Sequence, residues 1–404
     1  MDPVAITGAG LLTPLGGDVA SSWDGFRAGR LGITRAPAST GWHGWWAGVP
    51  DAFLAGRLDA AIVKRTDRFA QYALIAADEA LRDAGLGRLD AERTAIVLGS
   101  SMGGVPLLTD ARATLDAQGP TRVSPRLLAE VIPNMAAAAL ALRYALHGPQ
   151  LTITNACASG LDAIGLAARM IARGEVDVAL AGGTETLLTP VVAWSLERAG
   201  ALSSAEDIGR ASQPFDVART GFVMGDGCGV VVLESVAHAR KRDARVHGTV
   251  RGYGSLADGY HVTSPEPSGR WEARAMGRAL DDAGLGIETI DAVLAHGTAT
   301  IRGDAAEIRA IDTVYLGRRA PVPVTSLKGH VGHAMAASGP TSLIVALRGF
   351  AEQVLISTLG TTEVEPSARF DLVVGSPRSL ALRTVQINAF GFGGQNASLV
   401  VTSG

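Results

Sequence analysis

The chain has 404 residues, of which 47% are hydrophobic and 19% charged, so it can bury a large core and disorder is disfavoured. Its 36 basic and 39 acidic side chains leave a formal net charge of -3 without a basic block, which argues against nucleic-acid or anionic-membrane binding. Two cysteines, Cys157 and Cys228, form neither a disulfide framework nor a zinc cluster. Without a signal segment or a long apolar run, the sequence predicts a soluble cytoplasmic protein.

The first half opens on Ile6–Thr13, a strand followed by glycines that resemble a dinucleotide-binding loop. Thr13 occupies the third glycine position and no clear βαβ unit follows, so the pattern favours a strand-ending turn. The next expected elements are a helix over 68–84, strands over 94–99, 150–155 and 176–181, and a helix over 158–172. The loop-like stretch 203–226 is a candidate cover for a site.

The second half repeats the first. Residues 80–87 and 279–286 are identical at seven of eight positions, each at the end of an amphipathic helix that a glycine terminates. The expected elements of this half are a helix over 271–283, strands over 291–296, 322–326 and 384–388, and a mainly helical segment over 333–348. Strands alternating with helices predict two packed sheets with helices between and around them.

A possible serine nucleophile lies after the strand at 94–99. Gly99–Gly103 matches the Gly-x-Ser-x-Gly elbow, with Ser101 in the nucleophile position. The elbow requires a helix at once, whereas Gly103, Gly104 and Pro106 are poor for a helix interior. A serine hydrolase therefore stays an alternative, against a glycine-rich loop that lines a pocket.

Cys157 is the strongest local signal. A lone cysteine is usually a small buried hydrophobe, and we assign Cys228 to that class. Cys157 instead lies where a strand ends and an alanine-rich helix begins, and we expect the helix dipole to favour its thiolate. The sequence therefore makes Cys157 a candidate nucleophile.

Two histidines follow later strands. His296 ends one strand, and His333 follows another in the segment Lys328–His333, which also contains His330. His330 and His333 could bind a metal, but no third ligand is evident. Since strand ends of one repeated fold meet, we expect His296, His333 and Cys157 to converge. The glycine-rich turn Asn388–Gly394 is either a structural turn or a source of backbone N–H groups for an oxyanion.

Together these motifs resemble the β-ketoacyl-ACP synthases of the thiolase-fold superfamily, close to synthase II and to the ketosynthase subunits of type II polyketide systems. The resemblance runs almost end to end and also rests on the segments 4–8, 67–72, 132–135 and 214–227. It implies a thiolase-like α/β fold, with two duplicated halves, 1–245 and 246–404, in a five-layered αβαβα architecture. The family is dimeric.

The resemblance also implies catalytic roles. Cys157 would be the acyl-accepting thiolate, a soft nucleophile suited to thioester exchange. His296 and His333 would bind the malonyl thioester carbonyl and assist decarboxylation as neutral N–H donors. Lys328 would support the site electrostatically, and the family spacing from this lysine selects His333 rather than His330.

The same resemblance assigns the glycine-rich turn. Phe390 would be the gate between half-reactions, and the N–H groups of Cys157 and Phe390 would form the oxyanion hole, in a segment that continues through Gly391 and Phe392. The implied reaction is a decarboxylative Claisen condensation of a cysteine-bound acyl chain with malonyl-ACP, which gives β-ketoacyl-ACP, CO2 and free ACP. Such an acyltransferase uses substrates carried on the phosphopantetheine of ACP and needs no metal or redox cofactor.

Several positions depart from synthase II: Ala299, Ile301, Thr220, Ser342 and the segment 394–399. They favour a specialised polyketide or polyene pathway, with housekeeping fatty-acid elongation as the alternative. The expected partners are acyl carrier protein and either a second copy of the chain or a chain-length-factor-like subunit. Cys157 with both histidines argues against a non-catalytic subunit, and the C-terminal turn lacks the second cysteine of a thiolase.

Two surface assignments complete the expectations. Lys64, Arg65 and Arg68 form the densest basic cluster before the first repeated helix, a candidate docking patch for acidic carrier protein. Met102 and Met135 are expected to border the acyl tunnel, because methionine can yield to a chain or fill the space itself. A core position for Met102 is the competing interpretation.

Overall fold

A computed structural model describes the backbone of residues 1–404 and every side chain except that of Ser39. Its main sheet has 11 strands in the order β13-β11-β10-β15-β16-β9-β1-β8-β6-β4-β5. In the first half the strands are β1 (Val4–Leu12), β4 (Thr94–Gly99), β5 (Gln150–Ile153), β6 (Val178–Glu185) and β8 (Gly227–Ser235). In the second half they are β9 (Gly248–Ala257), β10 (Ala292–Leu294), β11 (Pro323–Thr325), β13 (Asp371–Leu372), β15 (Thr384–Gly391) and β16 (Gln395–Ser403).

The strand order confirms the duplication. Read outward from the junction, one half runs β1-β8-β6-β4-β5 and the other β9-β16-β15-β10-β11, so each strand of the first half has a counterpart, and β13 adds one edge strand to the second half. The two halves join where β1 pairs with β9 over Val4–Ile6. Short strands form two small sheets, namely β2 (Thr34–Arg35), β3 (Trp45–Ala47) and β7 (Met224–Gly225) in one, and β12 (Val354–Leu355) and β14 (Arg378–Ser379) in the other.

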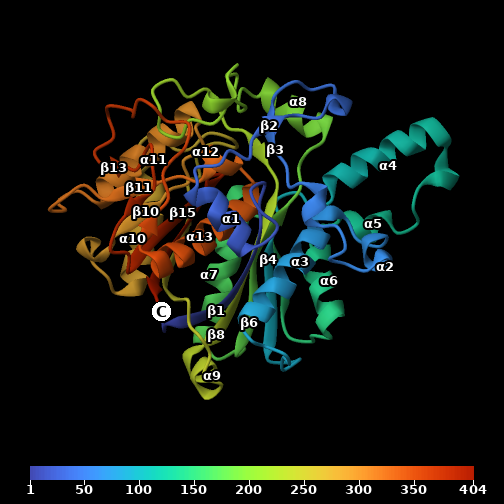
Figure 1. The fold of residues 1–404 in the computed structure, drawn as a ribbon, viewed down its shortest axis with the longest axis horizontal. Coiled ribbons are helices and arrows are strands. Elements are labelled where there is room, and N and C mark those ends of the chain that lie inside the picture. Colours follow the sequence, from blue (N-terminus) through green and yellow to red (C-terminus); the bar gives the residue numbers. More distant parts are fainter.

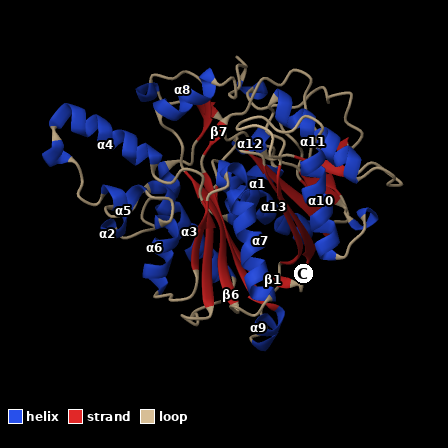
Figure 2. Ribbon diagram, turned by 180° about the vertical axis from the view of Figure 1, so that it is seen from behind, coloured by secondary structure: helices blue, strands red, loops and turns tan.

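Helices complete five layers, as the sequence predicts. The paired helices α7 (Ser159–Ala172) and α13 (Ser338–Glu352) lie between the two sheet halves (Figure 2). One outer layer contains α3 (Arg68–Asp83) and α6 (Met135–Tyr144), and the other contains α10 (Arg270–Ala283) and α11 (Ile301–Val314) (Figure 1). The remaining helices are α1 (Val19–Arg27), α2 (Ala60–Val63), α4 (Val105–Gln118), α5 (Leu127–Val131), α8 (Pro190–Arg198), α9 (Val236–Lys241) and α12 (Lys328–Val331).

The glycines of Ile6–Thr13 pack a helix onto a strand. The expected strand-ending turn is wrong, because β1 continues through this segment to Leu12. A Cβ atom on Gly8 or Gly10 would lie 2.1 or 1.9 Å from a carbonyl oxygen of α3, so glycine permits this close contact. The second half repeats the contact with Gly252 and Gly254 of β9, each of whose added Cβ atoms would lie 2.1 Å from a carbonyl oxygen of α10.

Two segments differ from the expected elements. The mainly helical segment expected over 333–348 is confirmed from Ser338 onward, but its helix begins later than expected: the chain leaves α12 at Gly332, which has a φ of 64°, and passes through a 3-10 turn at Met335–Ala337 before α13 begins. Helix α4 projects away from the body of the molecule (Figure 1). Within the described part of the chain, no helix combines the length and apolar character needed to cross a membrane.

Candidate active site

Cys157 lies in a turn that both halves of the fold contain. After β5 the chain enters a short 3-10 turn, Ala156–Ala158, and then α7. Ala156 has a φ of 47°, and Met335, which begins the matching turn before α13, has a φ of 43°. Such backbone conformations are strained for residues other than glycine, and strain of this kind concentrates at functional sites. The turn belongs to the fold, but only the first copy carries a cysteine, since Ala336 occupies the matching position.

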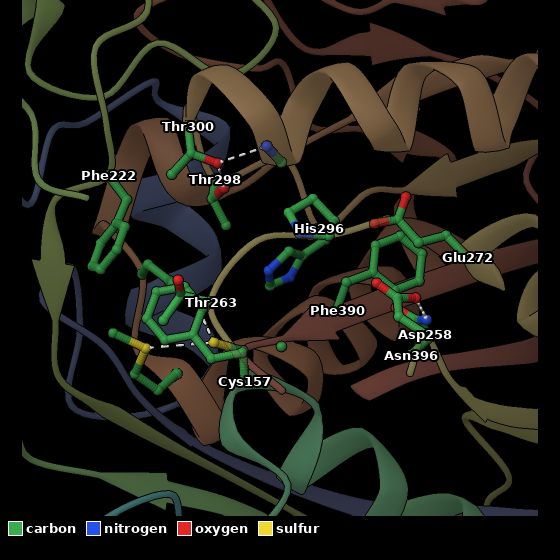
Figure 3. Close-up of a pocket in the computed structure, with 16 residues that line it drawn as sticks. Cys157, Phe222, Asp258, Thr263, Glu272, His296, Thr298, Thr300, Phe390 and Asn396 are labelled. Atoms are coloured by element: carbon green, nitrogen blue, oxygen red, sulfur yellow. Dashed lines mark hydrogen bonds between the residues drawn. The ribbon is translucent and has the colours of Figure 1, made fainter. Parts of the chain in front are cut away.

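The structure brings Cys157 together with the two expected histidines. The Cys157 Sγ atom lies 3.0 Å from His333 Nε2, and the two histidine rings meet edge to face with centroids 5.1 Å apart. His333 Nδ1 lies 3.0 Å from Ser338 Oγ, which fixes the ring. One ring nitrogen of His296, one of His333 and the sulfur of Cys157 all lie within 4.8 Å of one another. Figure 3 shows Cys157 and His296 in one cavity with Phe390, and His333 lines the same cavity.

Burial keeps both histidines neutral. It lowers the pKa of His296 and His333 well below the ordinary value, and the buried cation of Lys328 acts in the same direction. Neutral imidazoles can donate N–H hydrogen bonds without placing a cation beside a bound carboxylate. Lys328 donates from Nζ to the backbone carbonyl of His296. Burial lowers the pKa of Lys328 to about 8, although nearby Glu307 favours its charged form.

Burial of the Cys157 sulfur opposes the expected thiolate form and favours the thiol. Burial raises the pKa of Cys157 to about 12 and outweighs the opposing effects of Lys328 and of the N–H groups of Phe392 and Cys157 itself. Only 6% of the residue is exposed and it belongs to a buried apolar cluster, and such burial disfavours the charged form of a thiol. The thiol proton must therefore leave during attack, and His333 Nε2 is the nearest base.

Glu307 holds the His296 turn in place. The carboxylate accepts hydrogen bonds from the N–H groups of His296 at 2.8 Å and Gly297 at 2.6 Å. Glu307 is 1% exposed and lies on α11, eleven residues after the histidine. Sequence reasoning missed this residue, because a glutamate within an amphipathic helix is ordinarily solvent-exposed.

The structure corrects the assignment within the glycine-rich turn. Phe390 is still part of β15, is 7% exposed and packs against His296 with ring centroids 5.9 Å apart. The N–H group that reaches the Cys157 sulfur is that of Phe392, not the expected Phe390, because the chain turns over the cysteine only after β15 ends at Gly391. A Cβ atom on Gly391 would lie 3.0 Å from the Cys157 nitrogen, so this turn needs glycine. Phe392 is 39% exposed.

The rival nucleophile and the other titratable candidates have structural partners. Ser101 donates its hydroxyl to the buried carboxylate of Glu185 rather than to a histidine. Cys228 is fully buried beside Thr184, as expected of a small core residue. Both ring nitrogens of His330 contact backbone carbonyl oxygens, at 3.1 and 2.9 Å. These contacts place Ser101, Cys228 and His330 outside the reacting group.

The structure separates the expected surface and tunnel residues. Lys64 and Arg65 are exposed, whereas Arg68 is engaged with Asp51 and with the Tyr72 hydroxyl at 2.6 Å, so it is not a free docking cation. Met102 is 41% exposed, so its interpretation as a core residue is wrong.

Met135 lines a different pocket, beside Arg65. Among the described residues, the wall of the Cys157 cavity includes neither Met102 nor Met135. Cys157 instead shares a buried apolar cluster with Phe222, Leu187, Val192, Leu202 and Met335, of which Phe222 and Met335 line the cavity.

Comparison with known proteins identifies the family. Residues 1–239 match the family model described as the N-terminal domain of beta-ketoacyl synthase, and residues 247–362 match the model of its C-terminal domain. The chain belongs to the β-ketoacyl synthase family. Its curated relatives include the 3-oxoacyl-[acyl-carrier-protein] synthase 2 of Coxiella burnetii, 36% identical over 99% of this chain and 98% of the relative. The corresponding protein of Vibrio cholerae is 37% identical, with 98% of each chain covered.

Solved ketosynthases share the whole fold. A β-ketoacyl synthase from Burkholderia phymatum is 33% identical with a TM-score of 0.92, and all of both chains is covered. The ishigamide ketosynthase/chain length factor is 31% identical with a TM-score of 0.91, over 100% of this chain and 99% of that one. A type II polyketide ketosynthase in complex with its acyl-carrier protein is 28% identical with a TM-score of 0.91, over 99% of each chain. The synthase therefore has the thiolase-like fold and is an acyltransferase of the class to which these relatives belong.

Proposed function

We propose that this synthase condenses an acyl chain held on Cys157 with malonyl-ACP, in a specialised polyketide or polyene pathway. The observation that carries the proposal is the group of one thiol and two neutral imidazoles in a single cavity, with Cys157 Sγ 3.0 Å from His333 Nε2. An acyl-transfer step needs the thiol, and a decarboxylation step needs the two N–H donors.

The first half-reaction loads the cysteine. The Cys157 sulfur attacks the thioester carbonyl of acyl-ACP while its proton passes to His333 Nε2. The N–H groups of Cys157 and Phe392 stabilise the oxyanion that forms, because both already interact with the sulfur position. The C–S bond to the carrier then breaks, and the proton held on His333 goes to the departing carrier thiolate.

The second half-reaction forms the carbon–carbon bond. His296 and His333, the latter now in the neutral tautomer that carries its proton on Nε2 while Nδ1 accepts from the Ser338 hydroxyl, donate hydrogen bonds to the thioester oxygen of malonyl-ACP, so loss of CO2 leaves an enolate that they stabilise. The enolate carbon attacks the acyl carbonyl on Cys157, the bond between that carbonyl carbon and the Cys157 sulfur breaks, and the departing thiolate takes up one proton from solvent. The products are β-ketoacyl-ACP and CO2, and no step requires a metal or a redox cofactor.

The positions at which this chain differs from synthase II support a specialised pathway over housekeeping fatty-acid elongation. Ile301, where synthase II has proline, is 63% exposed at the N-terminus of α11, which borders the cavity at Thr300 and Gly303. Ser342, where glutamate is usual, is buried in the central helix α13. Changes at the rim and in the centre affect which chains fit and leave the catalytic group unchanged.

A second thiolase-fold chain is the proposed partner, in addition to acyl carrier protein. Exposed apolar side chains gather on and around α4 and α5, where Leu108, Leu115 and Leu128 are 46, 39 and 73% exposed. A patch of this kind marks an association surface, and Met102 is exposed close to it in sequence. Both a second copy and a chain-length-factor-like subunit fit this description, and sedimentation of the protein alone distinguishes them.

The test is condensation with defined carriers. Purified protein is incubated with malonyl-ACP and acyl-ACP starters of increasing length, and the carrier-bound products are read by mass spectrometry. Repeated extension to polyketide or polyene chains, or extension only with an added partner subunit, supports the specialised pathway. Single extensions of saturated starters across the fatty-acid range support housekeeping elongation, and carriers that keep their original masses overturn the proposed function.

A further inference from the structure

One carboxyl group in the wall of the active-site cavity has no partner. Glu272 lies in the first turn of α10, is 2% exposed and lines the cavity that contains Cys157 and Phe390. Its Oε2 atom is shielded from solvent and finds no hydrogen-bond partner among the described residues. Buried polar atoms are nearly always paired, so this one requires an explanation.

Four other polar side chains of the cavity wall, those of Asp258, Asn396, Thr298 and Thr300, already have hydrogen-bond partners. Asp258 Oδ1 accepts a hydrogen bond from Asn396 Nδ2 at 2.6 Å, and its Oδ2 atom accepts one from a backbone N–H at 2.9 Å. The hydroxyl groups of Thr298 and Thr300 lie 3.0 Å apart. Figure 3 shows Glu272, Asp258 and Asn396 grouped beside the ring of Phe390. Glu272 is therefore the carboxyl group of this wall that stays available to a ligand.

Its surroundings keep Glu272 protonated. Burial raises its pKa well above the ordinary value, and the nearby carboxyl groups of Glu307, Asp258, Glu266 and Asp304 act in the same direction. A protonated carboxyl group can donate its O–H to a carbonyl oxygen. It also carries no negative charge that would repel the carboxylate of a malonyl group.

The position of Glu272 suits the part of a substrate that precedes its thioester. The cavity extends from the exposed loop at Thr263, past Phe392, to the buried sulfur of Cys157. When the thioester of a substrate reaches Cys157 from solvent, the arm attached to that thioester must therefore lie along this passage. A pantetheine arm contains two amides, and their carbonyl oxygens are the acceptors that a buried O–H donor would match.

We propose that Glu272 is a substrate-binding residue whose carboxyl O–H donates a hydrogen bond to an amide carbonyl of the pantetheine arm. The inference rests on the proposed function for the nature of the arm. It adds a contact that discriminates carrier-type thioesters from thioesters that lack amides. The arm would thus supply the hydrogen-bond partner that Glu272 Oε2 lacks among the described residues.

The test compares Glu272→Met, which removes the donor at similar size, with Glu272→Gln, which keeps an N–H donor. For Glu272→Met we expect the KM for malonyl-ACP to rise about tenfold with kcat changed less than about twofold, as for a contact made equally in ground and transition states. Glu272→Gln is expected to raise KM by less than about threefold. The malonyl thioester of ethanethiol, which has no amide, should react at the same rate with wild type and Glu272→Met.

Two further measurements separate binding from structure. Removing an unpaired buried carboxyl should raise the melting temperature of Glu272→Met, whereas a structural carboxyl would make it fall. Glu266→Gln serves as the control. It removes the negative charge of a carboxyl group near Glu272, and Glu266 does not line the cavity. Calorimetry with a non-reactive thioether analogue of malonyl-pantetheine gives the dissociation constant without turnover.

The outcomes are distinct. An unchanged KM and dissociation constant for Glu272→Met, or an equal loss with the ethanethiol thioester, overturns the inference and leaves a structural or water-bound carboxyl. Wild-type protein that binds the analogue but never condenses overturns the proposed function instead. In that case a weaker dissociation constant for Glu272→Met still supports the contact with the arm.

Discussion

Removing the carboxylate of Glu307 tests how the site positions His296. The change Glu307→Ala leaves two buried N–H groups, those of His296 and Gly297, without their acceptors at 2.8 and 2.6 Å. Each unsatisfied buried donor costs about 1–3 kcal/mol, so the free energy of unfolding should fall by about 2 to 6 kcal/mol. Glu307→Gln keeps one acceptor oxygen, so about half of that loss is expected.

The same change should disturb catalysis, because His296 donates to the enolate only when its turn is held. We expect release of CO2 from malonyl-ACP to fall by about 10²-fold in Glu307→Ala, comparable with the loss of one oxyanion donor. Urea unfolding measures the stability, radiolabelled CO2 measures the rate, and Glu206→Ala at an exposed loop position is the control. A Glu307→Ala protein with wild-type decarboxylation and reduced stability would refute the positioning role.

Three other predictions follow from the site and its surroundings. His333→Ala should reduce CO2 release from malonyl-ACP by about 10²-fold or more, whereas His330→Ala should mainly lower stability; a greater catalytic loss for His330→Ala contradicts the assignment. Reversing the charges of Lys64 and Arg65 should raise the KM for acyl-ACP and weaken its salt dependence, and an equal loss with small thioesters would exclude docking there. Met102 is exposed outside the Cys157 cavity, so it can border the acyl tunnel only where a partner subunit covers it; with that subunit present, Met102→Trp should shorten the products and Met102→Ala should lengthen them, and unchanged product masses in both variants contradict a tunnel role.

The repeated architecture was predictable from the sequence because its signals are local. The matching segments at 80–87 and 279–286 end equivalent helices, and the alternation of strands and helices places them in two equivalent sheets. The segment Ile6–Thr13 misled the prediction, because glycines usually mark turns. Here they instead allow α3 to approach a continuous strand.

Within the site, strand ends predicted which side chains converge but not their chemistry. His296 and the segment that carries His333 follow the parallel neighbours β10 and β11, and Cys157 follows the corresponding strand β5 of the other half. The pKa of the thiol depends on burial by distant segments, which no local pattern reports. Two phenylalanines in one glycine-rich turn cannot be distinguished until the end of β15 is known, which is why Phe390 was expected where Phe392 lies.

The residues around the reacting groups could not be predicted from the sequence either. Glu272 resembles an ordinary first-turn residue of a helix, and only the packing of α10 against the cavity shows that it is buried without a partner. Its role depends on contacts far apart in the sequence, which composition and spacing do not contain.

The most direct test of the central claim is intact-protein mass spectrometry after incubation with acyl-ACP alone, followed by peptide mapping and then by addition of malonyl-ACP. We predict one acyl group on the peptide that contains Cys157, its loss when malonyl-ACP is added, and the simultaneous appearance of β-ketoacyl-ACP. The Cys157→Ala protein should carry no acyl group. An acyl group on Ser101, or β-ketoacyl-ACP formed by Cys157→Ala, would contradict the account.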